Sequence, residues 1–190
     1  MRIVGTDDAE VERVLRGGLL VCECGGVLRP WGWGRERAVR VAGGGEDRRS
    51  LRRSRCVSCG RTHVLLPADS LLRRRDAVGV IGAALTARAS GLSIGRTAAG
   101  VVGVPFSTVR GWLRRFTAVA GGVRAAFTVL AHDLDLLLGP VRATGNAVGD
   151  AVEAIGLAAR AAALRFGPVD AWQFAASASG GRLLCNTSCL

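Results

Sequence analysis

The sequence lacks the segments that would direct it to a membrane or out of the cell. Residues 1–8 carry two aspartates against one arginine and contain no apolar core of a secretory signal. No uncharged apolar run approaches the ~18 residues that cross a bilayer. We therefore expect a cytoplasmic protein without membrane contact, in which clustered cysteines bind metal or perform redox chemistry more often than they form disulfides.

Lysine is also absent, so all 26 basic residues are arginine, against 15 acidic residues and a net charge of +11. We attribute the choice of arginine over lysine to a genome rich in G and C. The placement of the charge is more informative, because 18 arginines but only five acidic residues lie between positions 29 and 116. A positive field confined to one segment is typical of a polyanion binder, since phosphate neutralisation releases counterions.

Clustered carboxylates are scarce in the neutral segment 117–190, which offers Asp133, Asp135, Asp150, Glu153 and Asp170. Metal-dependent strand transfer needs carboxylates that hold two Mg²⁺ ions on an α/β core. Asp133 and Asp135 are two apart on an expected helix and would point to different faces. We expect no catalytic residues and no enzymatic activity.

The pattern of glycines and apolar residues predicts an α+β fold that is mainly α. Residues 1–18 form an amphipathic lead-in. Residues 19–67 form a zinc-ribbon-like module with a small antiparallel sheet, whose expected strands cover 37–41, 51–56 and 62–66 around a turn at 43–47.

Helical patterns follow at 77–89, 94–102 and 106–116, so residues 68–116 are interpreted as a helix-turn-helix domain. Residues 117–184 form an Ala-rich helical region for dimerisation or partner docking, punctuated by Gly-Pro at 139–140 and 167–168. One helix face there is expected to carry Val148, Val152, Ile155, Ala159, Ala162 and Phe166. Residues 185–190 are a tail, in which we interpret Cys185 and Cys189 as free thiols.

Two close cysteine pairs, each followed by glycine, are typical of a structural zinc site. Cys56 and Cys59 have the usual two-residue gap, whereas Cys22 and Cys24 are separated by one residue. Three interpretations are open: zinc held by all four cysteines, zinc with His63 in place of Cys22, or a module that folds without metal. We favour structural Zn²⁺ held by the four cysteines.

The stretch from Gly95 to Arg115 predicts the helix-turn-helix itself. Ala99 is the expected small residue where the helices cross, and Gly103 is the expected turn. The expected apolar set is Ala98, Val102, Val104, Val109 and Trp112. The second helix then presents its DNA-binding residues, for base edges and phosphates, on one face: Ser107, Thr108, Arg110, Gly111, Arg114 and Arg115.

Two arginine runs near the motif predict a series of phosphate contacts: Arg52, Arg53 and Arg55, and then Arg73, Arg74 and Arg75. Three aromatic side chains could instead touch nucleic acid, but we favour packing for each of them: Trp31, Trp33 and Phe106.

These stretches resemble an actinobacterial family of unassigned function that joins an N-terminal zinc ribbon to a helix-turn-helix and is often found with insertion-sequence transposases. The similar segments are 24–33, 55–67, 107–116 and 179–184. The resemblance implies double-stranded DNA binding linked to mobile elements. The family has a full two-residue gap in its first cysteine pair, so Val21 is a departure.

Taken together, the sequence predicts a nucleoid-associated bacterial DNA-binding protein, as an accessory or targeting factor of a transposase. A transcriptional regulator is the first alternative. A zinc-ribbon adaptor that binds only proteins is the second. Self-association or transposase contact is assigned to residues 117–184.

Overall fold

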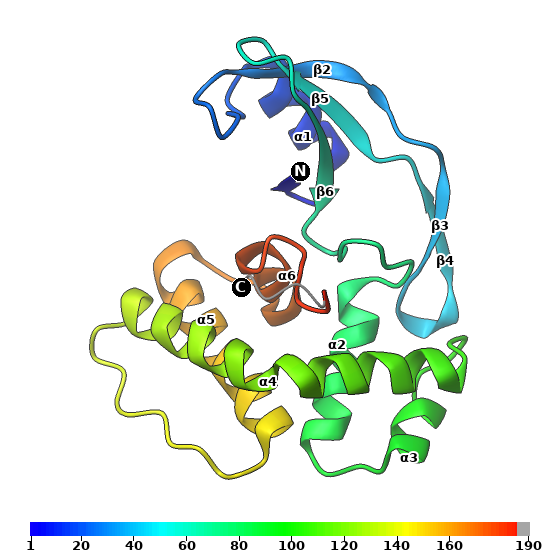
Figure 1. Ribbon diagram of the computed structural model, residues 1–190, viewed down its shortest axis with the longest axis vertical. Coiled ribbons are helices and arrows are strands. Elements are labelled where there is room, and N and C mark those ends of the chain that lie inside the picture. Colours follow the sequence, from blue (N-terminus) through cyan, green and yellow to red (C-terminus); the bar gives the residue numbers. More distant parts are fainter. Residues whose placement is uncertain (186–190) are drawn as a thin grey trace.

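An arched β-sheet leads into a layer of packed helices in the computed structural model, which describes residues 1–185 (Figure 1). The order of elements begins with β1 (Arg2–Val4), α1 (Asp8–Arg16), β2 (Leu28–Trp33), β3 (Arg37–Arg40), a short 3₁₀ turn η1 (Ala42–Gly44), β4 (Glu46–Arg49), β5 (Arg52–Cys56) and β6 (Thr62–Pro67). The helices α2 (Val78–Ala89), α3 (Ile94–Ala99), α4 (Phe106–Leu134), α5 (Ala147–Phe166) and α6 (Ala171–Ala178) follow. The fold class is α+β and mainly α, as the sequence predicted.

The main sheet has the strand order β1-β6-β5-β2, in which only the β1–β6 pair is parallel. β3 and β4 form a separate antiparallel hairpin that prolongs β2 and β5 toward the helices (Figure 1). The expected strands at 37–41, 51–56 and 62–66 correspond to β3, β5 and β6, with ends displaced by at most one residue. The turn expected at 43–47 overlaps η1 at the hairpin tip.

The lead-in belongs to the sheet module. β1 pairs with β6, and α1 is capped by the preceding Asp7, whose carboxylate accepts hydrogen bonds from the amides of Ala9 and Glu10. Val11 and Leu15 of α1 pack on the inner side of the sheet with four further buried residues: Cys22, Leu28, Cys56 and Leu65. This cluster is small, so apolar burial alone provides limited stabilisation of the sheet.

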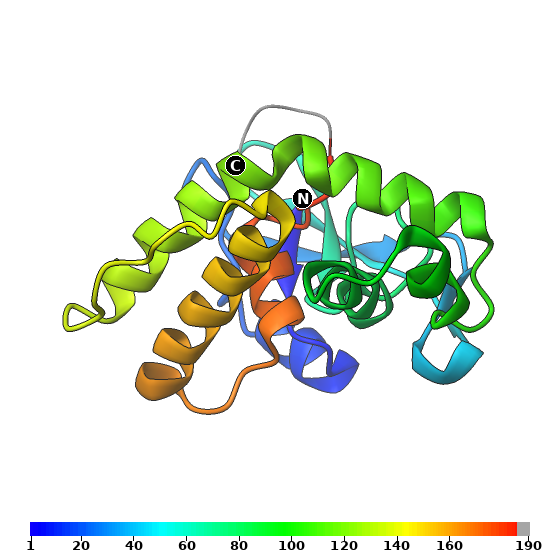
Figure 2. The ribbon, with the colours of Figure 1, turned by 90° about the horizontal axis from the view of Figure 1, so that it is seen from below.

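The helices share one larger core, which includes buried side chains of α2, α4, α5 and α6. Figure 2 shows α4 along one side of this layer, with α2 and α3 near its first half and α5 and α6 near its second. We predicted that this helix ends at 116, which is wrong, because Ala120, Val123, Phe127 and Ala131 continue its buried face to Leu134. That burial outweighs the weak helix propensity of the Gly121-Gly122 pair.

The expected face of α5 is largely confirmed. Val148, Ile155, Ala159 and Ala162 are buried, whereas Phe166 is 74% exposed at the end of the helix. Gly-Pro at 139–140 and at 167–168 lies between helices, as predicted.

The hairpin tip contacts the helices through Arg40. Its Nε lies 2.6 Å from Asp76 Oδ1, and its Nη1 donates to the carbonyl of Gly103 at 3.0 Å. The contact with Asp76 is a close ion pair without the angles of a hydrogen bond. On the other side of the tip, a Cβ at Gly44 would lie 2.9 Å from Val102 Cγ1, so glycine is needed for this close approach. The ribbon therefore touches the turn between α3 and α4.

Candidate metal centre and nucleic-acid interface

The four cysteines at 22, 24, 56 and 59 converge at one end of the sheet, with all four sulfur atoms within 4.8 Å of one another. Cys22 Sγ lies 3.8 Å from Cys59 Sγ, and Cys24 Sγ lies 3.5 Å from Cys56 Sγ. A tetrahedral ion with metal–sulfur bonds of about 2.3 Å separates its sulfur ligands by about 3.8 Å. The site could therefore hold a metal ion with little movement.

The shortened first pair is accommodated by a tight turn. The amide of Cys22 donates to the carbonyl of Gly26 at 2.8 Å, and the amide of Gly25 donates back to the Cys22 carbonyl at 3.0 Å. Gly25 has φ +81°, a conformation that side chains disfavour. At Gly26 a Cβ would lie 2.6 Å from Cys56 Sγ, so the backbone must approach the sulfurs here.

The second pair forms the turn that its spacing predicted. The amide of Gly60 donates to the Cys56 carbonyl at 3.1 Å. Backbone amides of Cys59 and Ser58 donate to the Cys56 sulfur and lower the pKa of this thiol to about 6, against the opposing effect of burial. At Cys24 a backbone hydrogen bond from Gly26 lowers the pKa, but hydrogen bonds with the thiols of Cys59 and Cys56 outweigh it and raise the pKa of Cys24 to about 11. Cys56 is therefore the first thiol of the pair to ionise, and a bound cation would be needed to hold Cys24 as a thiolate.

His63 lies beside the cysteine cluster. Its Nε2 is 3.3 Å from Cys22 Sγ, and the ring is buried on β6. Burial lowers the pKa of this imidazole, which favours its neutral form. Cys22 Sγ lies within 4.8 Å of the other three sulfur atoms, so the structure favours the four-cysteine set. In that set His63 contacts Cys22 from outside.

The helix-turn-helix forms from α3, a turn and the first part of α4. Ser93 caps α3 by accepting from the Arg96 amide, and Gly103 in the turn has φ +73°. Val109 and Trp112 are buried on α4 as predicted, together with Val104 in the turn.

Three expectations within this motif are wrong. Ala99 is exposed, and Thr97 and Ala98 take the buried positions of α3 because the helix is rotated toward them. Val102 is 66% exposed, since it belongs to the turn and faces the hairpin tip. Phe106 is 52% exposed at the start of α4 and does not join the core.

The outward face of α4 carries the six predicted DNA-binding residues. Ser107, Arg110 and Arg114 are exposed, and no ion pair of the described residues involves either arginine. Three others are half-buried: Thr108, Gly111 and Arg115, whose guanidinium donates to the Gly111 carbonyl at 3.2 Å. Sequence reasoning missed the exposed Arg96 on α3, although it lies inside the same motif.

The first arginine run is divided between the two sides of the sheet. Arg52 is bound internally, with Nε 2.7 Å from Glu12 Oε2 of α1 and Nη1 2.7 Å from the Gly32 carbonyl. Arg53 and Arg55 point to the opposite, exposed side. Arg52 is therefore not available for phosphate.

The second run lies before α2 and is likewise divided. Arg73 is exposed, in a left-handed backbone conformation with φ +59°. Arg74 is half-buried and donates to the Leu184 carbonyl at 2.8 Å, and burial lowers the pKa of its guanidinium. Arg75 lies 3.7 Å from a carboxylate oxygen of Glu46 in an exposed pair. Arg73 is the freest of the three.

The two tryptophans of β2 do not pack in the core as we expected. Trp31 is 52% and Trp33 is 55% exposed, and each has an arginine guanidinium over its ring. β2 lies at the edge of the sheet, and neither ring belongs to the buried cluster under it.

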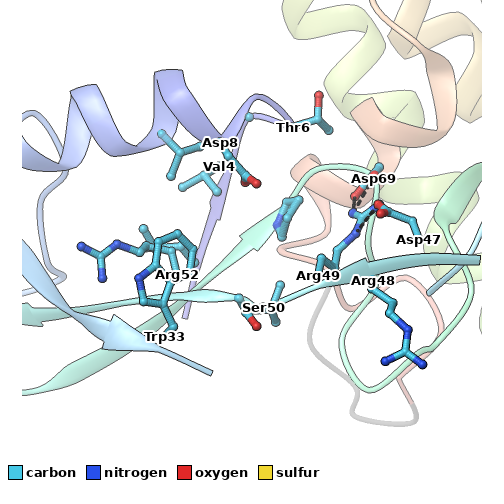
Figure 3. Close-up of a pocket in the computed structure, with 15 residues that line it drawn as sticks. Val4, Thr6, Asp8, Trp33, Asp47, Arg48, Arg49, Ser50, Arg52 and Asp69 are labelled. Atoms are coloured by element: carbon cyan, nitrogen blue, oxygen red, sulfur yellow. Dashed lines mark hydrogen bonds and ion pairs between the residues drawn. The ribbon is translucent and has the colours of Figure 1, made fainter. Parts of the chain in front are cut away.

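A cavity of about 270 Å³ lies between α1, β1 and the bend of the ribbon (Figure 3). Trp33 and Arg52 line one part of it, and Arg49 points toward Asp47 and Asp69 in another. Arg49 Nη1 donates to Asp69 Oδ1 at 2.8 Å, and these carboxylates raise the pKa of its guanidinium against the effect of burial. Of the charged residues that line the cavity, only Asp8 lacks an ion pair among the described residues.

No family model, curated protein or solved structure matches this chain. The resemblance to zinc-ribbon and helix-turn-helix proteins therefore stays a hypothesis. Within residues 1–185, none of the helices is long and apolar enough to cross a membrane. Cys185 is a free thiol, and Cys189 lies outside the described residues.

Proposed function

We propose that the chain binds double-stranded DNA in a sequence-directed manner through the first half of α4, and that its four cysteines hold a structural Zn²⁺ ion. The observation that carries the DNA proposal is the exposed face of α4. Arg110 and Arg114 extend from it without acidic partners among residues 1–185, within the strongly basic part of the chain. Guanidinium groups so placed can read guanine edges or neutralise phosphates.

Selection of bound sequences from a random duplex pool tests binding and specificity together. With the selected duplex, Arg110→Ala and Arg114→Ala are each expected to weaken binding about 5- to 150-fold, the range for base-contacting arginines. Arg160→Ala is the control, because Arg160 is also exposed but lies on α5 in the neutral region. Absence of any duplex binding at low salt, or equal losses in all three variants, would refute the proposal.

Zn²⁺ fits the donor set better than harder cations, because four thiolates at tetrahedral spacing suit a soft, closed site. With four protein ligands the ion would have a structural role. It would supply folding energy that the small inner cluster of the sheet does not.

Metal analysis of the purified protein tests this assignment. Cys22→Ser is expected to lose the ion, whereas His63→Ala should retain it with reduced affinity, since His63 contacts a ligand from outside. Retention of a full equivalent of zinc by Cys22→Ser, together with its loss in His63→Ala, would reverse the assignment.

Within DNA binding, the resemblance favours a transposase accessory or targeting factor over a transcriptional regulator. A recombinase with a carboxylate triad in a neighbouring reading frame would support the first role. The exposed side chains of Leu136, Leu137, Leu164 and Phe166 suit self-association or transposase docking through 117–184. Measurement of mass in solution at several concentrations distinguishes a dimer from a monomer that awaits a partner.

A further inference from the structure

The outer side of the main sheet, which faces away from α1, carries a group of exposed side chains. We call it the outer sheet face and define it by five residues: Trp31 of β2, Arg53 and Arg55 of β5, and Thr62 and Val64 of β6. The alternating residues Ser54, Cys56, His63 and Leu65 are buried on the inner side, which α1 covers (Figure 1). The strand alternation thus fixes which side chains reach solvent.

A bulge places Trp31 on this face. The register of β2 against β5 shifts between Pro30 and Gly32, so Trp31 is the extra residue. Because of this shift, Trp31 and Trp33 contact arginines on opposite sides of the sheet. The ring of Trp31 lies under the Arg55 guanidinium at 4.6 Å, whereas Trp33 lies 4.7 Å from that of Arg52, which binds α1.

The surroundings of Trp31 are cationic. Neither Arg53 nor Arg55 forms an ion pair with any residue of the described part of the chain, and Arg55 Nε donates to the Gly60 carbonyl at 3.1 Å. Glu23, at the cysteine end of the sheet, is paired with Arg61 at 3.2 Å. An exposed indole among unpaired guanidinium groups matches unpaired nucleobases joined by phosphates better than an apolar protein surface.

We infer that the outer sheet face is a binding site for single-stranded DNA, separate from the duplex-binding face of α4. One base stacks on the face of the half-exposed Trp31 ring that Arg55 leaves free, Arg55 supports the stack from the other face, and Arg53 holds a flanking phosphate. A duplex fits poorly, because its bases are stacked on one another and offer no free ring face. This site does not depend on the proposed duplex binding, since the two faces share no residue.

The test uses the full chain and a fluorescein-labelled oligothymidylate of about 12 nucleotides at low salt, followed by fluorescence anisotropy. Trp31→Ala is expected to weaken binding about 5- to 150-fold, the range for loss of one base–aromatic stack. Trp31→Phe should recover most of the affinity. Trp33→Ala is the matched control, since Trp33 is equally exposed but on the inner side.

Three results would overturn the inference: no binding of the oligothymidylate by the parent protein, unchanged binding by Trp31→Ala, or equal losses in Trp31→Ala and Trp33→Ala. Thermal melting of each variant separates loss of binding from loss of fold. In the same proteins, Arg110→Ala is expected to weaken only the selected duplex. Failure of duplex binding is therefore distinguishable from failure of the sheet site.

Discussion

Arg40 connects the ribbon to the helix-turn-helix, and its replacement is the sharpest test of how the two parts fit together. Its side chain is 13% exposed and that of Asp76 is 3% exposed, with 2.6 Å between Nε and Oδ1. In Arg40→Met the methionine fills much of the volume, but the Asp76 carboxylate stays buried without a counter-charge. Breaking a buried pair in this way costs about 3–5 kcal/mol.

We expect the lower end, about 3 kcal/mol, because Arg40 reaches the surface and water can enter in its place. For a chain of this size, that loss lowers the melting temperature by about 6–12 °C. The matched control is Arg48→Met in the same hairpin. Arg48 is 75% exposed and pairs with Glu36 at 3.0 Å, a contact worth less than about 1 kcal/mol.

Thermal melting measures both losses, and hydrogen exchange at the Val101 amide, which donates to the Ala98 carbonyl just before the turn, reports locally on the segment that Arg40 contacts. The double variant Arg40→Met/Asp76→Asn should recover part of the loss, because neither charge is then unpaired. If Arg40→Met melts within about 2 °C of Arg48→Met, the pair does not hold the ribbon to the helices and the reasoning fails.

Two further predictions concern packing and pH. Gly82→Ala in α2 should lower the free energy of unfolding by about 1–3 kcal/mol, because the new Cβ would lie 2.3 Å from Trp172 Cγ. Gly79→Ala in the same helix is the control. Its Cβ would have no neighbour within 4 Å, so this substitution should be neutral or stabilising. Denaturant titration of both checks this, and equal effects would contradict it. Hydrogen bonds from Thr144 lower the pKa of Asp150, so the stability they provide is present above the ordinary carboxyl range and is lost as pH falls through the lowered pKa. Thr144→Val should therefore lower the melting temperature near neutral pH and not in strong acid, and an equal decrease at both would show a pH-independent packing effect.

The convergence of the four cysteines was largely predictable, because cysteine-glycine turns are local and two such turns suit one tetrahedral site. The sequence left open whether Cys22 or His63 completes the set. The choice between them depends on the hydrogen-bonded turn around Gly25 and Gly26, and on the position of His63 on the buried side of β6. Neither feature can be derived from the spacing of residues in the sequence.

The strands β2 and β4 were not predicted, and the physical cause is the same for both. Each is held by pairing with a neighbouring strand although its own residues disfavour a strand. β2 contains Pro30 and Gly32, which disfavour strands, and it persists at the sheet edge with a bulge. β4 has the sequence Glu-Asp-Arg-Arg with no apolar residue and is held by its pairing with β3. The directions of Trp31 and Trp33 follow from that bulge, so they could not be inferred from composition.

The route from the cysteines to α4 is continuous in the backbone. β5 ends at Cys56, β2 follows the turn at Cys24, and both strands lead through β3 and β4 to the tip that contacts Gly103. The inner cluster under this sheet has only six buried residues, so a metal ion would contribute a large share of its stability. Loss of such an ion would destabilise the sheet. It would thereby weaken the contact of Arg40 with the turn before α4. A metal ion at the cysteines would thereby influence the start of α4 from the far end of the ribbon.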